Sequence, residues 1–387
     1  MVVKDDKIVK QNLIRQNNVK AITELLYLKP YSCLEISNMV KMSDVGVNKV
    51  IKQLLSFDMV KRTKPNPTEK KIGGQHIRYV INPNIGLYVC CDFTENIDTA
   101  YLYDFSLKLV DKVTFDTSYR ITEEEVLNAI NSIKLMLDKH LKNYSNNLLG
   151  IGISVPGQVD VNTNEFIETG KFVNIEKDFL YKNFKENFDT YIFIRNNVQL
   201  MAIGESYKLK LSEKPNTSTF IYVGVGLAAC VLLNGEVVTG WNGYAGEIGG
   251  NKVYPDSTLS RNCSLSRIHD KIKGKYPDIE YDGLFSLYDE NNEFHELVNE
   301  SARVLAMFMN NVTNLLGCDL FMIAGDALRF GDEYINVIKE YLDLHAPIKV
   351  NVKTYSLDSA SVVGTLKLLN DYVVIDYYKK LANCTIL

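Results

Sequence analysis

The chain has 387 residues, of which 46% are apolar and 23% are charged, proportions that exclude a disordered or fibrous protein and indicate a globular one of two or three domains. Its formal net charge of −4 is the sum of two unlike parts. Residues 1–84 carry 15 Lys and Arg against 7 Asp and Glu, whereas residues 85–387 carry 28 against 40. A small basic segment joined to a large acidic one favours a nucleic-acid-binding head.

Cysteine usage and hydropathy exclude further classes of protein. The 7 cysteines are scattered without a CxxC pair, and the 5 histidines form no closely spaced pair. We therefore expect free thiols, a cytoplasmic location and no metal site of local spacing. The N-terminal residues lack the apolar core of a signal peptide, and the most apolar stretch, 221–233, is too short to cross a bilayer.

The first 60 residues predict three helices. Apolar residues from Val19 to Leu26 follow helical spacing, and two further patterns of this kind come after them. Ser32 and Ser43 precede those two patterns, where a serine hydroxyl can accept hydrogen bonds from the free amides of a first turn. Two short helices, a tight turn and a third helix are the elements of a helix-turn-helix.

Residues 59–63 and 77–81 predict two strands around a basic loop, which is a β-hairpin wing. Residues 41–78 hold nine Lys and Arg against three Asp and Glu, and clustered cations favour binding to DNA phosphates. On the third helix, Asn and Gln can pair with adenine, and Lys can reach guanine or phosphate. The residues that we expect to contact DNA are Ser43, Asp44, Asn48, Lys49, Lys52, Gln53, Lys61, Arg62, Lys70, Lys71 and Arg78. A protein–protein adaptor with solvated lysines is the weaker alternative, because helix, turn, helix and wing follow in order.

Beyond residue 84, strands and helices alternate. Strands are predicted over 87–93, 99–103, 148–155 and 191–194, helices over about 123–141 and 198–209, and a hairpin or two strands over 219–233. Such alternation over about 300 residues predicts an α/β body of two lobes.

Three segments of this body carry motifs that resemble those of the ROK family (repressors, open reading frames, sugar kinases). Residues 150–159 read GIGISVPGQV and are similar to GIGxxxPGxV; residues 234–249 resemble NGxxxxGxxGxAGEIGH; residues 314–325 resemble NLLNPExIVIGG. The resemblance extends over nearly the whole chain, including the head, which the family's repressors carry and its kinases lack. It implies an actin-like, hexokinase-type ATPase fold with a sugar cleft between two lobes, and within the family it favours the group of xylose and N-acetylglucosamine repressors.

Positions that the family's kinases need for phosphoryl transfer are changed. The catalytic aspartate corresponds to Asn197, whose amide cannot act as a general base. The first phosphate loop, D-x-G-G-T in the kinases, reads DFTEN over 92–96 and lacks both glycines. Two of four glycines are replaced in 224–230, and Asp326 stands where the kinases place nucleotide. We therefore expect no ATP-dependent kinase activity and no cofactor.

The resemblance retains part of the family's sugar site. The positions that match sugar contacts are Asn174, Asn196, Asn197 and Glu247. The family's zinc site is lost, because of its three cysteines only Cys263 has a counterpart and its histidine is Gly250, so we expect no metal. A structural alternative stays open, in which Glu247 caps a helix, Asn196 holds a turn and the body is a dimerisation scaffold.

These observations predict a repressor of carbohydrate-utilisation genes that binds double-stranded operator DNA as a homodimer and has no membrane partner. We expect residues 1–84 to form the winged helix-turn-helix domain and 85–387 the sugar-kinase-like domain. Within the latter, lobe 1 is expected over about 85–195 plus the C-terminal helix, and lobe 2 over about 196–360. A carbohydrate effector in the cleft would close the lobes and release DNA. A sugar kinase with a DNA head and a ligand-free scaffold are the alternatives.

Overall fold

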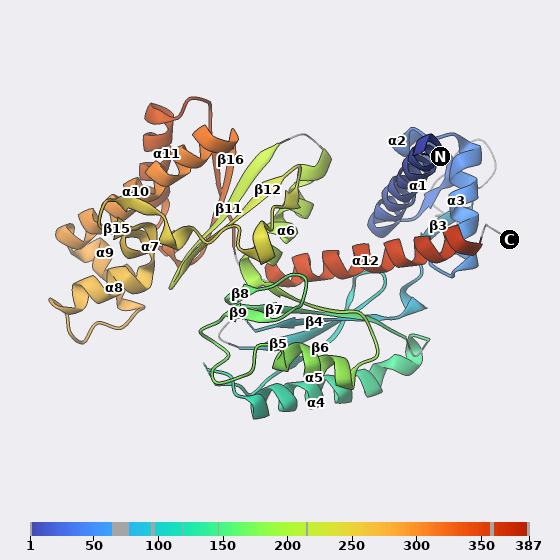
Figure 1. Cartoon of the computed structure of the whole chain (residues 1–387), viewed down its shortest axis with the longest axis horizontal. Coiled ribbons are helices and arrows are strands. Elements are labelled where there is room, and N and C mark those ends of the chain that lie inside the picture. The colour runs from blue at the N-terminus through green and yellow to red at the C-terminus, as the bar shows by residue number, and fades with distance from the viewer. Residues whose placement is uncertain are drawn as a thin grey trace, which may run out of the picture.

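The computed structural model describes residues 2–63, 77–93, 97–118, 120–145, 147–213, 216–356 and 360–384. They form an N-terminal head and two sheet-centred lobes, and one long C-terminal helix runs from the lobes to the head (Figure 1). Within the described ranges, no helix combines the length and the apolar character needed to cross a membrane.

The head combines three helices with a small antiparallel sheet. Its helices are α1 (Val2–Leu28), α2 (Cys33–Val40) and α3 (Asp44–Ser56), and its sheet has the order β1-β3-β2, from β1 (Tyr31–Ser32), β2 (Val60–Thr63) and β3 (Arg78–Ile81). Both predicted serine caps are confirmed: Ser32 accepts from the amide of Glu35, and Ser43 from that of Gly46. The two wing strands are confirmed as β2 and β3.

Lobe 1 is built on a five-stranded sheet of order β10-β7-β4-β5-β6. Its strands are β4 (Leu87–Asp92), β5 (Thr99–Asp104), β6 (Leu109–Thr114), β7 (Leu148–Val155) and β10 (Ile192–Asn196). Helices α4 (Glu123–His140) and α5 (Phe179–Asn187) cover one face, and α12 (Ala360–Cys384) covers the other (Figure 1). Cys90 and Cys91 lie on opposite faces of β4, as the strand period requires, and both are buried.

Lobe 2 is built on a second five-stranded sheet, of order β13-β12-β11-β16-β17. Its strands are β11 (Thr217–Val223), β12 (Leu227–Leu233), β13 (Glu236–Val237), β16 (Leu320–Ala324) and β17 (Asn351–Thr354). One face packs on α6 (Asn197–Leu209), and the other is covered by α7 (Leu259–Cys263), α8 (Leu265–Lys273), α9 (Gly283–Glu290), α10 (Asn292–Leu316) and α11 (Asp332–His345). The predicted hairpin over 219–233 is confirmed as β11 and β12, which pair antiparallel.

Short elements complete the two lobes. Two-stranded ribbons are formed by β8 (Gln158–Val159) with β9 (Phe166–Glu168) and by β14 (Lys252–Tyr254) with β15 (Ser257–Thr258). Single-turn 3-10 helices are η1 (Pro83–Ile85), η2 (Leu141–Asn143), η3 (Leu211–Glu213), η4 (Trp241–Gly243), η5 (Ile248–Gly250) and η6 (Asp326–Phe330). The ribbon β8–β9 and η4 bring the two lobes into contact, because a Cβ added to Gly243 would lie 2.8 Å from the carbonyl oxygen of Val159.

The helices α6 and α12 cross at two glycines. A Cβ on Gly364 would lie 1.8 Å from the carbonyl oxygen of Leu200, and a Cβ on Gly204 would lie 2.6 Å from that of Ala360. Only glycine permits this approach of two backbones. Since α6 packs on the sheet of lobe 2 and α12 on the sheet of lobe 1, the two lobes meet at this crossing.

Candidate functional site

The exposed face of α3 carries side chains that the sequence predicts to meet DNA. Ser43, Asp44, Asn48, Lys49 and Lys52 are exposed, and Gln53 is half-buried. The opposite face of the helix is apolar and fully buried in the core of the head. Within the described residues, Lys49 and Lys52 have no ion-pair partner. This face therefore presents cations that the fold itself does not use.

The wing adds two more exposed cations. Lys61 and Arg62 lie on β2, the strand that follows α3 in the sequence, and both are exposed. The predicted contacts Lys70 and Lys71 fall outside the described residues. The wing thus supplies two described basic side chains that can reach phosphates next to the groove that a recognition helix enters.

Arg78 is held inside the head. Its guanidinium donates to the carboxylate of Glu35 at 2.9 Å and to the carbonyl oxygen of Pro30 at 3.4 Å. Glu35 also accepts from the amide and hydroxyl of Ser32, at 2.8 and 2.9 Å. Burial raises the pKa of Glu35, but the bonds from Ser32 and the charge of Arg78 outweigh it and hold the pKa below its ordinary value. Arg78 therefore joins β3 to the first turn of α2, and its predicted contact with DNA stays a prediction.

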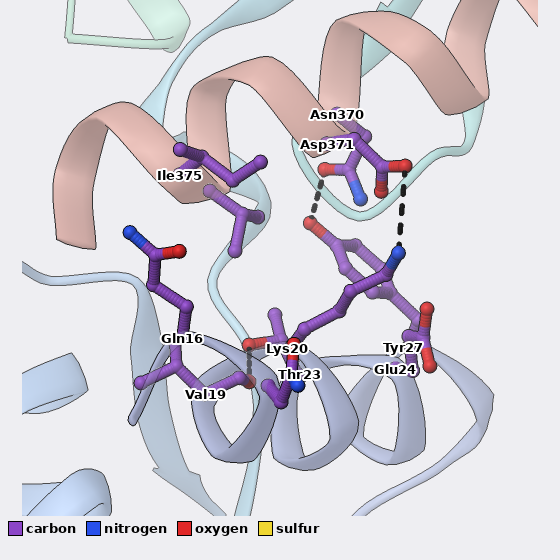
Figure 2. Close-up of a pocket in the computed structure, with 11 residues that line it drawn as sticks. Gln16, Val19, Lys20, Thr23, Glu24, Tyr27, Asn370, Asp371 and Ile375 are labelled. Carbon is purple, nitrogen blue, oxygen red and sulfur yellow. Dashed lines mark hydrogen bonds and ion pairs between the residues drawn. The ribbon is translucent and has the colours of Figure 1, made fainter. Parts of the chain in front are cut away.

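Helix α12 connects lobe 1 to the head through a buried polar cluster (Figure 2). The side-chain oxygen of Asn370 accepts from the hydroxyl of Tyr27 on α1 at 2.6 Å, the bond that Figure 2 shows. It also accepts from the hydroxyl of Tyr88 on β4 at 3.1 Å. Burial raises the pKa of both tyrosines, which keeps them protonated as donors. Asp371 lies 3.9 Å from the ammonium group of Lys20, beside a cavity of about 140 Å³ between α1 and α12. The head and lobe 1 thus share one core that α12 completes.

The predicted sugar residue Asn196 is used by the fold. Its Oδ1 accepts from the amides of Val198 and Gln199 at 2.9 and 3.1 Å, which caps α6, and its Nδ2 donates to the carbonyl oxygen of Gly157 at 2.7 Å. The structural alternative for this residue is therefore observed. Asn197 follows it, half-buried, and its side chain has no hydrogen-bond partner in the part of the chain that the structure describes. Asn197 is the amide at this position that is available to a ligand.

The segment 240–247, here called the cleft loop, reaches the same place from lobe 2. The side chain of Gln199 donates to the carbonyl oxygen of Gly243 at 3.4 Å. Glu247 is exposed at the end of the loop and does not cap η5, so the structural alternative for this residue is not observed. Asn174 lies exposed in the loop before α5, with a φ of 56°, and its predicted contact with a sugar stays a prediction. The hydrogen bond from Gln199 to Gly243 joins the first turn of α6 to the cleft loop.

Asp92, at the start of the segment that resembles the first phosphate loop, and Asp326, at the predicted nucleotide position, both accept hydrogen bonds from this chain. Asp92 is buried, and the hydroxyl of Ser361 at the start of α12 donates to it at 2.7 Å. Asp326 accepts from the hydroxyl of Tyr281 at 3.0 Å, and burial together with this carboxylate raises the pKa of Tyr281. Residues 94–96 of the first phosphate loop fall outside the described residues. Asp92 keeps the aspartate of the kinases' D-x-G-G-T pattern, whereas Asp326 is a change from the kinases, and a carboxylate repels a polyphosphate beside it.

The remnant of the family's zinc motif is buried in the core of lobe 2. The thiol of Cys263 contacts the carbonyl oxygen of Ser301 at 3.4 Å, and burial raises its pKa to about 12, so the thiol is protonated at neutral pH. Zinc binds the thiolate form. Among the described residues, no three His, Cys, Asp or Glu side chains gather closely enough to hold a metal ion.

Sequence reasoning did not single out Asn370. Asn370 bonds to a residue 343 positions away, so no local pattern could reveal it.

Comparisons with known proteins agree on one family. A model described as "ROK family" matches residues 88–372. The chain is 22% identical over 375 residues to the xylose repressor of Staphylococcus xylosus. The aligned region covers 92% of this chain and 95% of that repressor. Its structure is similar to that of a ROK family transcriptional regulator described as a homologue of the E. coli MLC protein, with a TM-score of 0.74 at 16% identity, covering 94% of this chain and 99% of the other.

A sugar kinase of the same family is also similar. The ROK hexokinase of Thermus thermophilus matches with a TM-score of 0.61 at 15% identity and covers 75% of this chain and 99% of that one. The regulator therefore accounts for more of this chain than the hexokinase does. Together the two likenesses confirm the expected fold class, a winged head followed by a two-lobed actin-like body. Because the matching family model covers well over half of its residues, this chain belongs to the ROK family.

Proposed function

We propose that this protein is a DNA-binding transcriptional regulator that represses carbohydrate-utilisation genes and responds to a carbohydrate bound between its lobes. The observation that carries the proposal is the exposed face of α3, whose basic and polar side chains the fold leaves without ion-pair partners among the described residues. In a winged helix-turn-helix, that helix enters the major groove. Asn48 and Gln53 then read base edges, while Lys49 and Lys52 reach guanine or phosphate. The similarity to a xylose repressor over nearly the whole chain supports this function.

The proposal assigns residues 1–84 to the DNA-binding domain and 85–387 to the effector domain. A homodimer presents two heads to half-sites that are related by two-fold symmetry. The six cysteines whose side chains the structure describes are free, and five of them are buried, which fits the reducing cytoplasm where such DNA is found.

Kinase activity is not part of the proposal. Asn197 has no carboxylate to accept the proton of a sugar hydroxyl, Thr94 and Glu95 replace the two glycines of the first phosphate loop, and Asp326 places charge where nucleotide would lie. Because a ROK hexokinase shares the fold, a kinase is the second candidate. A coupled assay of ADP release with D-glucose, D-xylose and N-acetylglucosamine separates the two, and we expect no release above the ATPase background. Sugar-dependent ADP release that disappears in Asn197→Ala would contradict the proposal.

The proposed response runs along α12. A carbohydrate bound at the first turn of α6 and the cleft loop contacts both lobes and favours their closed arrangement. Since α6 and α12 meet backbone to backbone at Gly204 and Gly364, a change in the angle of the lobes moves α12. The far half of α12 holds the head through Asn370, so the spacing of the two heads in a dimer changes and the affinity for DNA falls.

The proposal is tested by mapping where the full-length protein binds in its own genome. We expect a small set of palindromic sites beside genes for sugar transport and breakdown, and Lys49→Ala with Lys52→Ala should remove them. Gel shifts with a recovered site then measure the release of DNA by each sugar. Binding without sequence preference would contradict the regulator, whereas specific binding that no sugar alters would favour the ligand-free scaffold.

A further inference from the structure

A cavity of about 140 Å³, here called the joint cavity, lies where the head meets lobe 1. One wall is α1 of the head and the other is α12 (Figure 2), and no residue of α3 or of α6 lines it. Val19, Val374 and Ile375 give it an apolar side. Since an apolar cavity of about 150 Å³ can hold benzene, the joint cavity has room for a ligand of about six to eight non-hydrogen atoms.

Asn370 presents a free hydrogen-bond donor to the joint cavity. Its side-chain oxygen is used by the hydroxyls of Tyr27 and Tyr88, so the amide nitrogen is the end that remains. Asn370 is 7% exposed, and its Nδ2 has no hydrogen-bond partner among the described residues. Figure 2 shows this nitrogen pointing from α12 toward α1. Because a nearly buried donor has lost most of its water, an acceptor that enters the cavity gains a hydrogen bond there.

Two opposite charges line the joint cavity without a close partner. The ammonium group of Lys20 lies 3.9 Å from Asp371, whose two carboxylate oxygens already accept from Lys367 at 2.5 Å. Glu24, one helical turn after Lys20, forms no ion pair within the part of the chain that the structure describes. Partial burial raises the pKa of Glu24, and the charges of Lys367 and Lys20 oppose that rise. The cavity therefore offers one loosely held cation and one unpaired anion.

We propose that the joint cavity binds a small α-amino acid in its zwitterionic form. The carboxylate of the ligand accepts from Nδ2 of Asn370 and from Lys20, and its ammonium group donates to Glu24. A short aliphatic side chain lies on the apolar side of the cavity. A ligand with one charge alone is repelled, because an anion meets Glu24 and a cation meets Lys20. Both charges of a zwitterion find an opposite charge on the wall.

A ligand in the joint cavity contacts the head and lobe 1 at once. Two of its partners, Lys20 and Glu24, lie on α1, and the third, Asn370, lies on α12. Its binding therefore stabilises the arrangement of the head on lobe 1 that the structure shows. Since the cavity is lined by no residue of α6, this ligand acts at the joint itself, independently of a carbohydrate between the lobes.

The experiment titrates the full-length protein with L-alanine, L-serine and L-valine by calorimetry. Each amino acid is compared with the amine that lacks its carboxylate and the acid that lacks its ammonium group; for L-valine these are isobutylamine and isovalerate. Xylitol is the neutral polyol of similar size. We expect at least one amino acid to bind and to raise the melting temperature, and its two analogues and xylitol to bind at least tenfold more weakly.

Variants place that amino acid in the joint cavity. Lys20→Gln and Glu24→Gln should each raise its Kd at least tenfold, because each removes the charge that one end of the zwitterion meets. Ile375→Phe should do the same by filling the apolar side, and a side chain that is 40% exposed leaves room for the ring in a folded protein, which circular dichroism checks. The matched controls, Lys339→Gln and Glu340→Gln on the exposed face of α11, should leave the Kd unchanged.

Three outcomes would overturn the proposal. If no amino acid binds, the joint cavity is not an amino-acid site. If one binds and the three cavity variants bind it as tightly as the wild type does, its site lies elsewhere in the chain. If an amine, an acid or xylitol binds as tightly as the amino acid, the ligand is not recognised as a zwitterion. None of these results bears on the release of DNA by a sugar, which is measured separately.

Discussion

The exposed face of α3 and the start of α6 differ in what two sets of predicted binding side chains do in the free protein. On α3, Lys49 and Lys52 extend into solvent, and no ion pair among the described residues depends on them. At the cleft, Asn196 caps α6 and bonds to the carbonyl oxygen of Gly157. A polar residue in a family motif can thus be free for a ligand or committed to the fold. Stability measurements separate the two cases, because only a committed residue lowers the free energy of unfolding when it is removed.

The crossing that joins the cleft to the head should show the largest loss of stability. Gly364→Val places a side chain against the carbonyl oxygen of Leu200, 1.8 Å from the ideal Cβ position. We expect the free energy of unfolding to fall by about 3 kcal/mol, the upper end of overpacking costs, because a backbone atom cannot rotate away. Urea denaturation followed by circular dichroism measures it. Gly274→Ala, where nothing lies within 4 Å, is the control and should lose nothing comparable. Equal losses in both variants would show that α6 and α12 are not in close contact.

Asn370→Ala should have the next largest effect. It removes the acceptor that Tyr27 and Tyr88 share and leaves two buried hydroxyls without it. We expect a loss of about 2 kcal/mol, since each buried group left unsatisfied costs about 1–3 kcal/mol. The same denaturation measures it, with the exposed Asn128→Ala of α4 as the control. A loss no greater than that of the control would show that α12 does not hold the head through this cluster.

Asn196→Ala tests the committed side of the comparison. It removes the cap of α6 and the bond to Gly157, and we expect a loss of about 1 kcal/mol in the free energy of unfolding. Asn196→Asp keeps the capping oxygen and loses only the donor, so its loss should be smaller. Unchanged stability in Asn196→Ala, together with a large loss of sugar affinity, would reverse the assignment and make this residue a ligand contact.

Lys49→Ala tests the free side and should have the smallest effect on stability, within about 0.5 kcal/mol of the wild type. Its affinity for the operator should nevertheless fall about tenfold, with a preference for sites that differ from the wild-type site at the contacted base. Lys52→Ala should weaken binding more evenly across sequences and reduce the dependence of log affinity on log salt by about 1. Fluorescence anisotropy with labelled operator measures both, with the exposed Lys339→Ala of lobe 2 as the control. Wild-type affinity in both variants would refute the recognition helix.

Features set by neighbouring residues could be predicted from the sequence. Ser32 and Ser43 cap their helices through amides three positions away, so the pattern that predicts the cap contains all of its atoms. The paired strands β4 and β5 likewise follow from two apolar runs that lie a few residues apart in the sequence. The alternation of helices and strands was sufficient to predict two lobes.

Features that depend on residues far apart in the chain could not be predicted from the sequence. Arg78 reads as a basic wing residue, but its partner Glu35 lies 43 positions earlier. The role of Asn196 depends on a carbonyl group 39 positions away. Helix α12 is covered by lobe 1, by α6 and by α1, so apolar residues occur on several of its sides and a single apolar stripe does not mark it. The sequence alone therefore identified candidate sugar-binding residues, but it left open which of their side chains the fold already uses in its own hydrogen bonds.

The proposed function depends on a carbohydrate changing the affinity of the head for DNA. The affinity of the full-length protein for a DNA site recovered from its genome is measured by anisotropy, with and without D-glucose, D-xylose or N-acetylglucosamine. We expect one sugar to weaken binding at least tenfold. Equal affinity for the site in the presence of every sugar would contradict a sugar-responsive regulator.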